Sequence, residues 1–465
     1  MVFSSITFLY YFLPIVLLIY FIVPSKFRNL VLLISSLFFY FYGEPRYILV
    51  LLFSVVFNYY MGKLISKEDS KYRKVLFISD MIINFGLLFY FKYFDFFIDN
   101  INQILNIKIP LFNIIMPIGI SFFTFQATSY VIDIYLGKVK SANSILDFAA
   151  YLSLFPQLIA GPIVRYQTID QELKDRSVTY QKFADGVKRF IIGLSKKVLL
   201  ANVLGVFSNS LSSISTSSVL SYWLQAISNT LQLYLDFSGY SDLAIGLGLM
   251  FGFTFLENFN YPFIASSITE FWHRWHISLS TWFRDYVYIP LGGSRVGKFR
   301  NYLNILIVWM ITGLWHGASW NFVFWGLYFA CFLVIEKIFL LSFLKKHKLL
   351  GLFYTNILVV ISFVIFNQTT VSGIYKFLTS MFGLQHLPFS NLETIYYLKN
   401  YFIIFIVSIL CSTPIIHYFI QKLNQNKMIH KIFEIVEPII YICLLLLCTS
   451  YIIDESYNPF LYFRF

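Results

Sequence analysis

The chain has 465 residues, of which 58% are apolar and only 12% are charged, and its mean hydropathy is +0.70. Because a water-soluble domain carries nearer a quarter charged residues, this composition excludes an ordinary soluble protein and predicts an all-α polytopic membrane protein. The net charge of +12 does not predict nucleic-acid binding, because the basic residues gather beside apolar segments, as they do in the cytoplasmic loops of membrane proteins.

Apolar segments long enough to cross about 30 Å of hydrocarbon as helices recur from end to end. In chain order they are 7–23, 29–42, 47–62, 75–97, 112–136, 219–236, 238–253, 302–315, 319–340, 350–366, 400–420 and 432–452. We expect roughly ten to twelve transmembrane helices, with re-entrant and interfacial helices besides, because some neighbouring pairs could be single bent helices.

The distribution of basic residues predicts the orientation in the membrane. Lys and Arg residues follow the first, third and fifth segments, whereas the loops 43–46 and 98–111 carry one basic residue each. This alternation places the N-terminus outside the cytoplasm, and an even number of spans places the C-terminus there too. No Lys or Arg precedes Lys26 and no small-residue cleavage site follows the first apolar run, so we expect that run to remain as an anchor.

We expect one membrane-embedded domain over 1–465. Its zones are N-terminal spans (1–136), a catalytic core with re-entrant and interfacial segments (137–326), C-terminal spans (327–453) and an extracytoplasmic tail (454–465). Pro156, Gly161 and Pro162 interrupt the segment 154–166, which predicts broken backbone inside protein or beside a cavity. The basic amphipathic stretch 180–200 is predicted to lie flat on the cytoplasmic leaflet.

Seven of the eight tryptophans and three of the seven histidines lie between Trp272 and Trp325. If 271–286 is one helix, a polar stripe and an aromatic face result. The stripe is His273, His276, Ser280 and Arg284, and the lipid-facing side is Phe271, Trp272, Trp275, Leu279 and Trp282. The alternatives are an interfacial aromatic helix with incidental polar residues, or a metal site on the histidine pair. We disfavour a metal, because a membrane di-iron site needs more clustered histidines than this chain has.

His316 is the sharpest candidate for chemistry. It lies between the apolar runs 302–315 and 319–340, next to Trp315 and before Gly317. An ionisable side chain at membrane depth is costly and indicates function by default, and a neutral buried imidazole can accept a proton. The alternative is a structural histidine with satisfied hydrogen bonds. Asp236 and Asp242, on either side of Gly239, are further candidates, because a helix break there would expose them on a cavity wall.

Two long motifs resemble the signature blocks of the membrane-bound O-acyltransferases, in particular the bacterial alginate and peptidoglycan O-acetyltransferase type. They are F-W-H-R-W-H-I-S-L-S-T-W-F-R-D-Y-V-Y-I-P-L-G-G (271–293) and L-W-H-G-A-S-W-N-F-V-F-W-G (314–326). Shorter similar segments follow the family's order: F-Y-G-E-P (41–45), S-F-F-T-F-Q (121–126), L-F-P-Q-L-I-A-G-P-I-V-R (154–165), D-F-S-G-Y-S-D (236–242) and N-F-N-Y-P-F (258–263). The resemblance therefore covers nearly the whole chain.

The resemblance implies that His316 and His276 are the catalytic histidines and that His273 is not. It favours a set of residues that support them or line a donor or acceptor tunnel: Trp275, Ser280, Arg284, Asp285, Trp315 and Asp236. It also implies acetyl transfer from cytoplasmic acetyl-coenzyme A, with neither a permanently bound cofactor nor a metal. A hydroxyl attacking a thioester needs a base for its proton, and His316 could be that base.

The same resemblance predicts a multi-pass protein of the bacterial cytoplasmic membrane, surrounded by lipid. Its implied partners are an extracytoplasmic SGNH or serine-esterase-type O-acetyltransferase and a polysaccharide acceptor, with no nucleic acid. Tyr462 carries the only hydroxyl of the terminal segment F-L-Y-F-R-F (460–465). We expect it to relay the acyl group or to dock the partner; an interfacial aromatic anchor is the alternative.

Two other functions remain open from the sequence. A transporter or flippase for a glycan precursor would rely on Asp236 and Asp242 and would show no acyl chemistry. A structural subunit that only recruits an envelope complex would tolerate mutation of both signature blocks.

Overall fold

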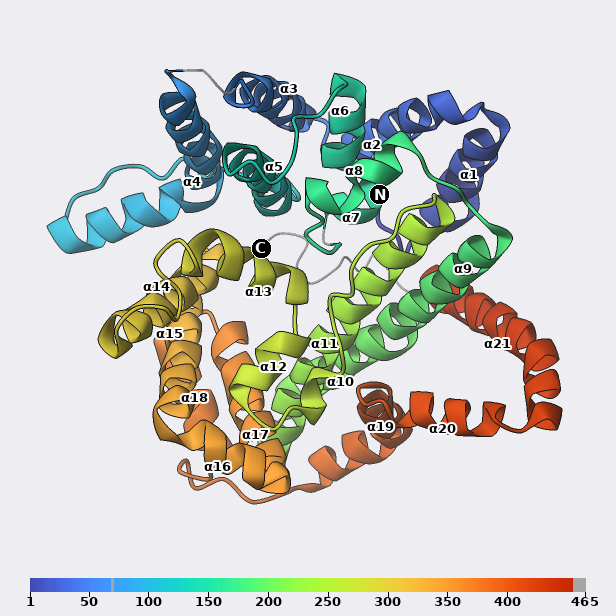
Figure 1. The fold of residues 1–465 in the computed structure, drawn as a ribbon. Helices are drawn as coiled ribbons and strands as arrows, with labels where there is room; N and C mark the ends of the chain where they lie inside the picture. The colour runs from blue at the N-terminus through green and yellow to red at the C-terminus, as the bar shows by residue number, and fades with distance from the viewer. Residues whose placement is uncertain (68–70, 160, 455–465) are drawn as a thin grey trace. The chain divides into compact units, whose positions relative to one another are not determined.

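The computed structural model describes residues 1–67, 71–159 and 161–454, and all regular secondary structure in these ranges is helical (Figure 1). This confirms the predicted all-α class. Within these ranges, seven helices are long and apolar enough to cross a membrane, and Thr7–Ile22 is a shorter apolar helix. The seven are Ile48–Ile65, Arg73–Leu105, Tyr180–Ser212, Trp320–Lys346, Lys348–Asn367, Leu392–Cys411 and Lys427–Asp454.

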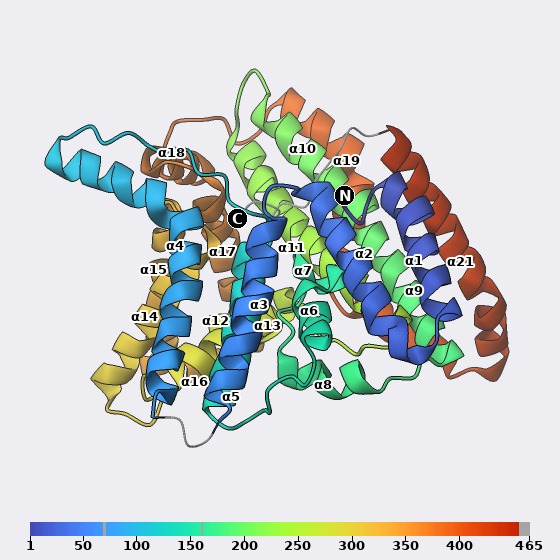
Figure 2. The same cartoon turned by 90° about the horizontal axis from the view of Figure 1, so that it is seen from above.

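The chain forms two compact units. The first consists of residues 1–190 and 241–256, and the second of residues 191–240 and the described chain from 257 onward. The helices that begin in the first unit are α1 (Leu13–Ile22), α2 (Arg28–Gly43), α3 (Ile48–Ile65), α4 (Arg73–Leu105), α5 (Ile120–Tyr135), α6 (Ile145–Ser153), α7 (Phe155–Leu158), α8 (Tyr166–Lys174) and α9 (Tyr180–Ser195). In this unit α3, α4 and α5 run side by side (Figure 2).

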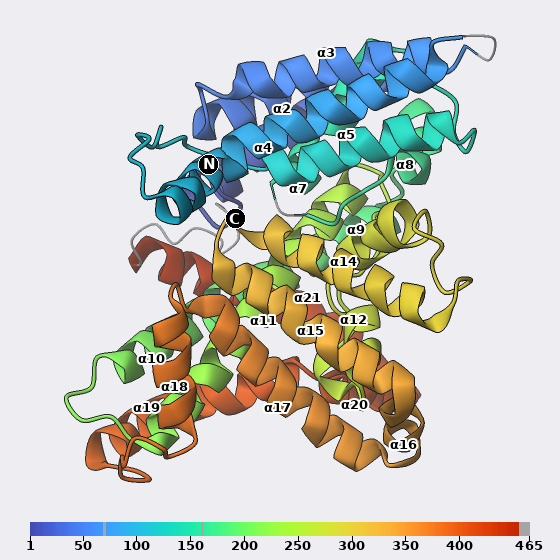
Figure 3. The same cartoon turned by 90° about the vertical axis from the view of Figure 1, so that its left-hand side faces the viewer.

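The remaining helices begin in the second unit. They are α10 (Asn202–Ser212), α11 (Val219–Met250), α12 (Ile268–Arg274), α13 (Ile277–Phe283), α14 (Lys298–His316), α15 (Trp320–Ile335), α16 (Leu341–Lys346), α17 (Lys348–Asn367), α18 (Val371–Met381), α19 (Leu392–Cys411), α20 (Ile415–Asn424) and α21 (Lys427–Asp454). Helices α14 and α15 form a hairpin, and α17 contacts α15 (Figure 3).

Two glycines allow the helices of this hairpin to pack closely where they cross. A Cβ atom at Gly313 of α14 would collide with the carbonyl oxygen of Phe322, and one at Gly326 of α15 would collide with the carbonyl oxygen of Trp309. Because side chains are missing at both points, the two backbones approach closely enough for direct contact. This hairpin carries His316 at the end of its first helix.

The predicted break at Gly239 is wrong. The separate segments 219–236 and 238–253 are one continuous helix, α11. A Cβ atom at Gly239 would lie 2.8 Å from the carbonyl oxygen of Gly193. The glycine is therefore a close-packing position, where α11 crosses the helix that contains Gly193.

The flat surface helix predicted for 180–200 is also wrong. Helix α9 continues through a π-helical segment (Lys196–Ala201) into α10, and together they form one of the helices long enough to span a membrane. Lys197 is only 3% exposed, and its Nζ atom lies 2.7 Å from Oδ1 of Asp236 in α11. Pairing with a buried carboxylate lets this lysine lie inside the protein, where periodicity had predicted a cytoplasmic surface.

The interrupted backbone of 154–166 is confirmed. Pro156 stands in the first turn of the short helix α7, no helix follows among the described residues until α8, and Gly161 and Pro162 are buried. A Cβ atom at Gly161 would lie 2.7 Å from the Cα atom of Gln157. The irregular backbone is thus enclosed by protein within the first unit.

Candidate active site

The segment 271–286 is bent, so the prediction of one continuous helix is wrong. Helix α12 ends at Arg274, and α13 begins at Ile277. His276, between them, has a left-handed backbone with φ of +44°. The carbonyl oxygen of Asn258 accepts the backbone N–H of Ile277 at 2.9 Å. This contact with a distant segment replaces the hydrogen bond that would have continued the helix.

The bend removes the predicted polar stripe. His276 is buried, with 1% of its surface exposed, whereas His273 in α12 is exposed. The apolar residues predicted to face lipid are buried as well: Phe271, Trp272, Trp275, Leu279 and Trp282. Trp272 packs edge-on against Phe329 of α15. This side of the segment faces the protein interior, so the prediction that it faces lipid is wrong.

The surroundings of His276 define which of its nitrogens carries the proton. Oδ1 of Asn258 lies 3.2 Å from Nδ1 of His276 and accepts hydrogen bonds from the backbone N–H and the hydroxyl of Ser278. A backbone N–H can only donate, so this Asn258 atom is the carbonyl oxygen, and Nδ1 of His276 must donate to it. Nε2 is then the nitrogen with the free lone pair.

His276 is a neutral base in this environment. Burial lowers the pKa of its imidazole to about 3, because the charged form loses its hydration. Among the described residues Nε2 is buried and has no hydrogen-bond partner. The ring is enclosed by Phe237, with ring centres 4.7 Å apart, and by Trp315 at 6.0 Å.

His316 ends α14 and is also buried, with 2% of its surface exposed. Its ring centre lies 4.9 Å from Trp315, 4.9 Å from Trp325 and 5.4 Å from Phe366. Trp315 therefore contacts the rings of both His276 and His316. The two histidines predicted from the sequence to be catalytic, His276 and His316, lie beside the same indole ring.

The other sequence-predicted residues occupy different surroundings. Trp275 stacks on Phe271 and packs edge-on against Phe259, whose ring lies 6.4 Å from that of His276. Asp285 pairs with Arg284, with Oδ1 2.7 Å from Nε. Tyr462 lies outside the described residues.

The two intramembrane aspartates do not share a cavity wall. Asp236 pairs with Lys197, and Asp242 with Arg189, whose Nη2 atom lies 2.6 Å from Oδ1. Each carboxylate thus has its own cation. In the part of the chain that the structure describes, no three His, Cys, Asp or Glu side chains are grouped to hold a metal ion.

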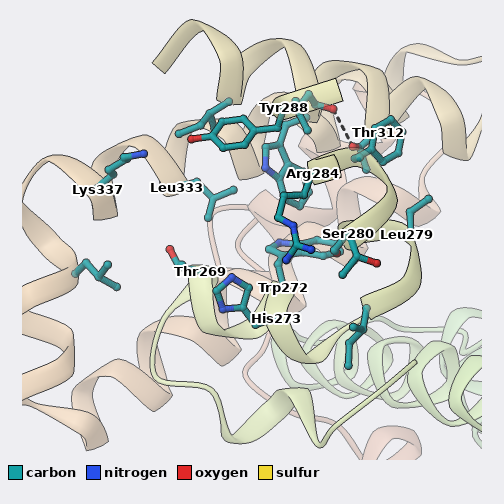
Figure 4. A pocket seen from close by; sticks show the side chains of 17 residues that line it. Thr269, Trp272, His273, Leu279, Ser280, Arg284, Tyr288, Thr312, Leu333 and Lys337 are labelled. Carbon is teal, nitrogen blue, oxygen red and sulfur yellow. Dashed lines mark hydrogen bonds between the residues drawn. The ribbon is translucent and has the colours of Figure 1, made fainter. Parts of the chain in front are cut away.

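A cavity of about 660 Å³ lies between α12, α13, α14 and the end of α15 (Figure 4). Ser280 and Arg284 line it, together with His273 and Lys337. Neither His276 nor His316 belongs to its lining. Two aromatic side chains separate the cavity from His316. Trp272 forms part of the cavity wall, and its ring centre lies 5.6 Å from that of Trp325. Trp325 in turn contacts His316.

Sequence reasoning missed two residues that position this region. Asn258 orients His276, as described above. Glu336, 1% exposed, accepts hydrogen bonds from the backbone N–H groups of Ile268 and Thr269 at 2.7 and 2.9 Å, and from the Thr269 hydroxyl. It thereby fixes the start of α12. A lone glutamate in the apolar run 319–340 was a usable signal, because unpaired acids are costly at membrane depth.

These features define a polytopic membrane protein with an internal polar site enclosed by aromatic rings. The family model described as MBOAT, membrane-bound O-acyltransferase family, matches residues 37–375. Because this match covers well over half of the chain, the protein belongs to the MBOAT family, and it is an acyltransferase.

Named relatives agree with this assignment. A probable alginate O-acetylase of Pseudomonas aeruginosa is 41% identical over 82% of this chain and 75% of its own length. A peptidoglycan O-acetyltransferase of Helicobacter pylori is 33% identical over 98% of this chain and 90% of its own length. A teichoic acid D-alanyltransferase of Bacillus subtilis is 29% identical over 51% of this chain and 63% of its own length.

Proposed function

We propose that this protein takes an acetyl group from cytoplasmic acetyl-coenzyme A and passes it across the membrane for O-acetylation of a cell-envelope or secreted polysaccharide. The observation that carries the proposal is the pair of buried histidines around Trp315. Two of the relatives are named for O-acetylation of alginate or peptidoglycan, which supports acetyl as the group and a glycan as the final acceptor.

In the proposed reaction, His316 removes the proton from a hydroxyl as its oxygen attacks the thioester carbonyl. The carbon–oxygen bond forms, the carbon–sulfur bond breaks, and the thiolate leaves and takes up the proton as the free thiol. General-base catalysis of this kind contributes about 10²–10⁴-fold to the rate. His276, neutral and with its Nε2 lone pair available, is the second catalytic histidine, and Trp315 holds the two imidazoles in place.

We assign supporting roles to the remaining residues. Arg284, in its pair with Asp285, and Ser280 face the acyl donor from the cavity. Trp275 packs the segment that ends at His276, and Asp236 keeps Lys197 neutralised inside the helix crossing. None of these five residues takes part in bond making.

The acetyl group must cross from a cytoplasmic donor to an acceptor outside. We propose that the protein acts as one membrane-embedded domain of the bacterial cytoplasmic membrane, with both termini outside. Tyr462 then relays the acyl group to, or docks, an extracytoplasmic partner of the SGNH or serine-esterase type. The positive-inside distribution of Lys and Arg supports this orientation.

The direct test is acetyl transfer from labelled acetyl-coenzyme A by purified His316→Ala, with the exposed His417→Ala as a matched control. We expect the His316 variant to insert and fold normally but to lose transfer by at least about 10²-fold, while the control keeps it. Near-normal transfer by the His316 variant would refute the proposed base. Glycan transport without thioester cleavage by the wild type would favour the flippase instead.

A further inference from the structure

A second cavity, the polar cavity, has a volume of about 250 Å³ and lies where α10 ends, α11 begins and α17 leads into α18. All of its lining residues belong to the second unit. Three serines, two glutamines, a tyrosine and a lysine contribute polar groups to the lining, and Phe377 contributes an apolar ring. Because pockets for drug-sized ligands have volumes of roughly 300–1,000 Å³, this cavity fits a smaller polar group, of the size of one sugar ring.

Three side chains of the polar cavity are available to a ligand. Among the described residues, Gln225, Gln368 and Lys376 form no side-chain hydrogen bond and no ion pair. Both glutamines are half-buried, and Lys376 is exposed. A Cβ atom at Gly373 would lie 2.9 Å from Oε1 of Gln368, so the glycine leaves room beside this oxygen. Because a polar group that loses water without gaining a partner costs free energy, the two free amides indicate a polar ligand.

The walls of the polar cavity are fixed by contacts within the protein. Nε1 of Trp223 in α11 donates to the carbonyl oxygen of Met381 in α18 at 2.8 Å, which joins the two helices. The ring of Tyr222 packs edge-on against that of Phe377, with ring centres 4.9 Å apart. Two aromatic side chains therefore offer apolar surface beside the free amides. A sugar ring presents hydroxyls at its edge and C–H groups on its face, so it matches both kinds of surface.

The polar cavity lies next to the end of α17 that contacts His316. The ring of Phe366 lies 5.4 Å from that of His316, and the Phe366 carbonyl oxygen accepts from the side-chain amide of Asn321 at 2.9 Å. Gln368, in the lining, follows two residues later, about 3 Å further along the helix axis. One short segment therefore connects the polar cavity to the proposed catalytic base.

The charge pattern places the polar cavity on the outer side of the membrane. Helix α17 begins next to three lysines, Lys345, Lys346 and Lys348, and the positive-inside rule places such a cluster in the cytoplasm. The helix is long enough to cross the membrane, so its other end, at Asn367, lies outside. The polar cavity thus faces the compartment in which the polysaccharide is acetylated.

We propose that the polar cavity binds one acidic sugar of the acceptor polysaccharide. The sugar hydroxyls contact Gln225 and Gln368, the ring packs against Tyr222, and the carboxylate pairs with Lys376. The inference rests on the proposed function and adds to it the class of acceptor, a glycan that carries carboxylates. The cavity has a binding role only: the bound sugar keeps the polymer beside the outer end of the acyl path, and no bond is made or broken there.

Equilibrium binding to the purified full-length protein tests the assignment. The probes are a short oligouronate and the same oligomer with its carboxylates reduced to alcohols. We expect Lys376→Gln to bind the oligouronate about tenfold more weakly, because a charge-assisted hydrogen bond is lost, and to bind the reduced oligomer like the wild type. The double variant Gln225→Ala, Gln368→Ala should bind both probes more weakly. The matched control Lys399→Gln removes an exposed lysine of α19 outside the cavity and should change neither affinity.

Unchanged oligouronate affinity in Lys376→Gln, or no oligouronate binding by the wild type, would overturn the proposal. An equal loss of affinity for both probes in Lys376→Gln would contradict the carboxylate contact. An acidic peptide that binds more tightly than the oligouronate, with the same dependence on Lys376, would assign the cavity to a peptide carboxylate and overturn the glycan.

His316→Ala separates this proposal from the proposed function. It should bind the oligouronate like the wild type while it fails in acetyl transfer. Transfer by His316→Ala would refute the proposed base and leave the polar cavity assigned. In cells, Lys376→Gln should lower the acetylation of an acidic polymer several-fold, whereas Lys399→Gln should not. Equal acetylation by these two lysine variants would contradict a role of the polar cavity in acceptor binding.

Discussion

Oδ1 of Asn258 accepts from both Nδ1 of His276 and the backbone N–H of Ser278, at 3.2 and 3.1 Å. One side-chain oxygen therefore fixes the tautomer of the imidazole and the start of the helix that follows it. Because the contact bridges eighteen residues of sequence, the orientation of His276 depends on the loop before α12 as well as on its own segment. The first prediction follows from this contact.

Asn258→Ala should lower the acetyl transfer rate by about tenfold or more, because Nδ1 of His276 loses the acceptor that selects its tautomer and orients its ring. Steady-state assays on the purified variant should show the loss mainly in kcat. Asn260→Ala is the matched control, since Asn260 is exposed. An Asn258→Ala enzyme with wild-type kcat would contradict the positioning role.

His276 should make the stability of the protein depend on pH in acid. Its folded pKa of about 3 lies below the ordinary value of 6.5, so between these pH values the unfolded chain binds a proton that the folded chain does not. The free energy of unfolding should therefore decrease as pH falls from 6.5 toward 3, by about 1.4 kcal/mol per pH unit. Denaturant unfolding in detergent at several pH values measures this slope.

His276→Asn should remove that contribution to the slope, whereas the exposed His386→Asn should leave it in place. If both variants keep the wild-type slope, His276 is not the buried neutral imidazole that the structure shows. Activity between pH 6 and 8 should not report the titration of His276, because its pKa lies well below this range.

Gly313→Ala and Gly326→Ala should each destabilise the hairpin of α14 and α15. Each methyl group would collide with a backbone carbonyl of the facing helix, and overpacking of this kind typically costs about 1–3 kcal/mol. Thermal unfolding should shift downward, and transfer should fall as His316 moves. Gly86→Ala in α4 is the control, because nothing lies within 4 Å of its added Cβ atom. Equal melting of all three variants would rule out a tight crossing.

Tyr462→Phe and deletion of 460–465 should separate relay from docking. If the hydroxyl carries the acyl group, both changes abolish polymer acetylation in cells, while thioester cleavage by the purified protein persists. If the tail only docks the partner, Tyr462→Phe retains acetylation and the deletion does not. Normal acetylation after the deletion would exclude both roles.

The helical class and the importance of the aromatic block were predictable, because composition and motif order are local properties of the sequence. The bend at His276 was not. Hydrophobic periodicity predicts one helix over 271–286, because it does not include the distant hydrogen bond from the backbone N–H of Ile277 to the carbonyl oxygen of Asn258. The meeting of His276 and His316 at Trp315 depends on the same tertiary contacts, and the catalytic role of the two histidines stays a prediction.

The prediction that the aromatic side of 271–286 faces lipid was wrong for another reason. In an apolar chain, a lipid-facing indole and a core indole have the same hydropathy, so Trp272 and Trp275 could not be placed inside from sequence. Likewise, the lysines of 180–200 predicted a surface helix, because the sequence does not show that Lys197 pairs with the buried Asp236. Sequence reasoning identified the ionisable residues but not their pairing.

The Lys197–Asp236 pair constrains how the protein enters its membrane. Either residue alone at the centre of a helix would oppose insertion by roughly 3 kcal/mol, and the two helices that carry them are consecutive in the chain. The penalty disappears only once the charges have met. Helices α9–α10 and α11 should therefore leave the insertion machinery together, as a hairpin that is already closed.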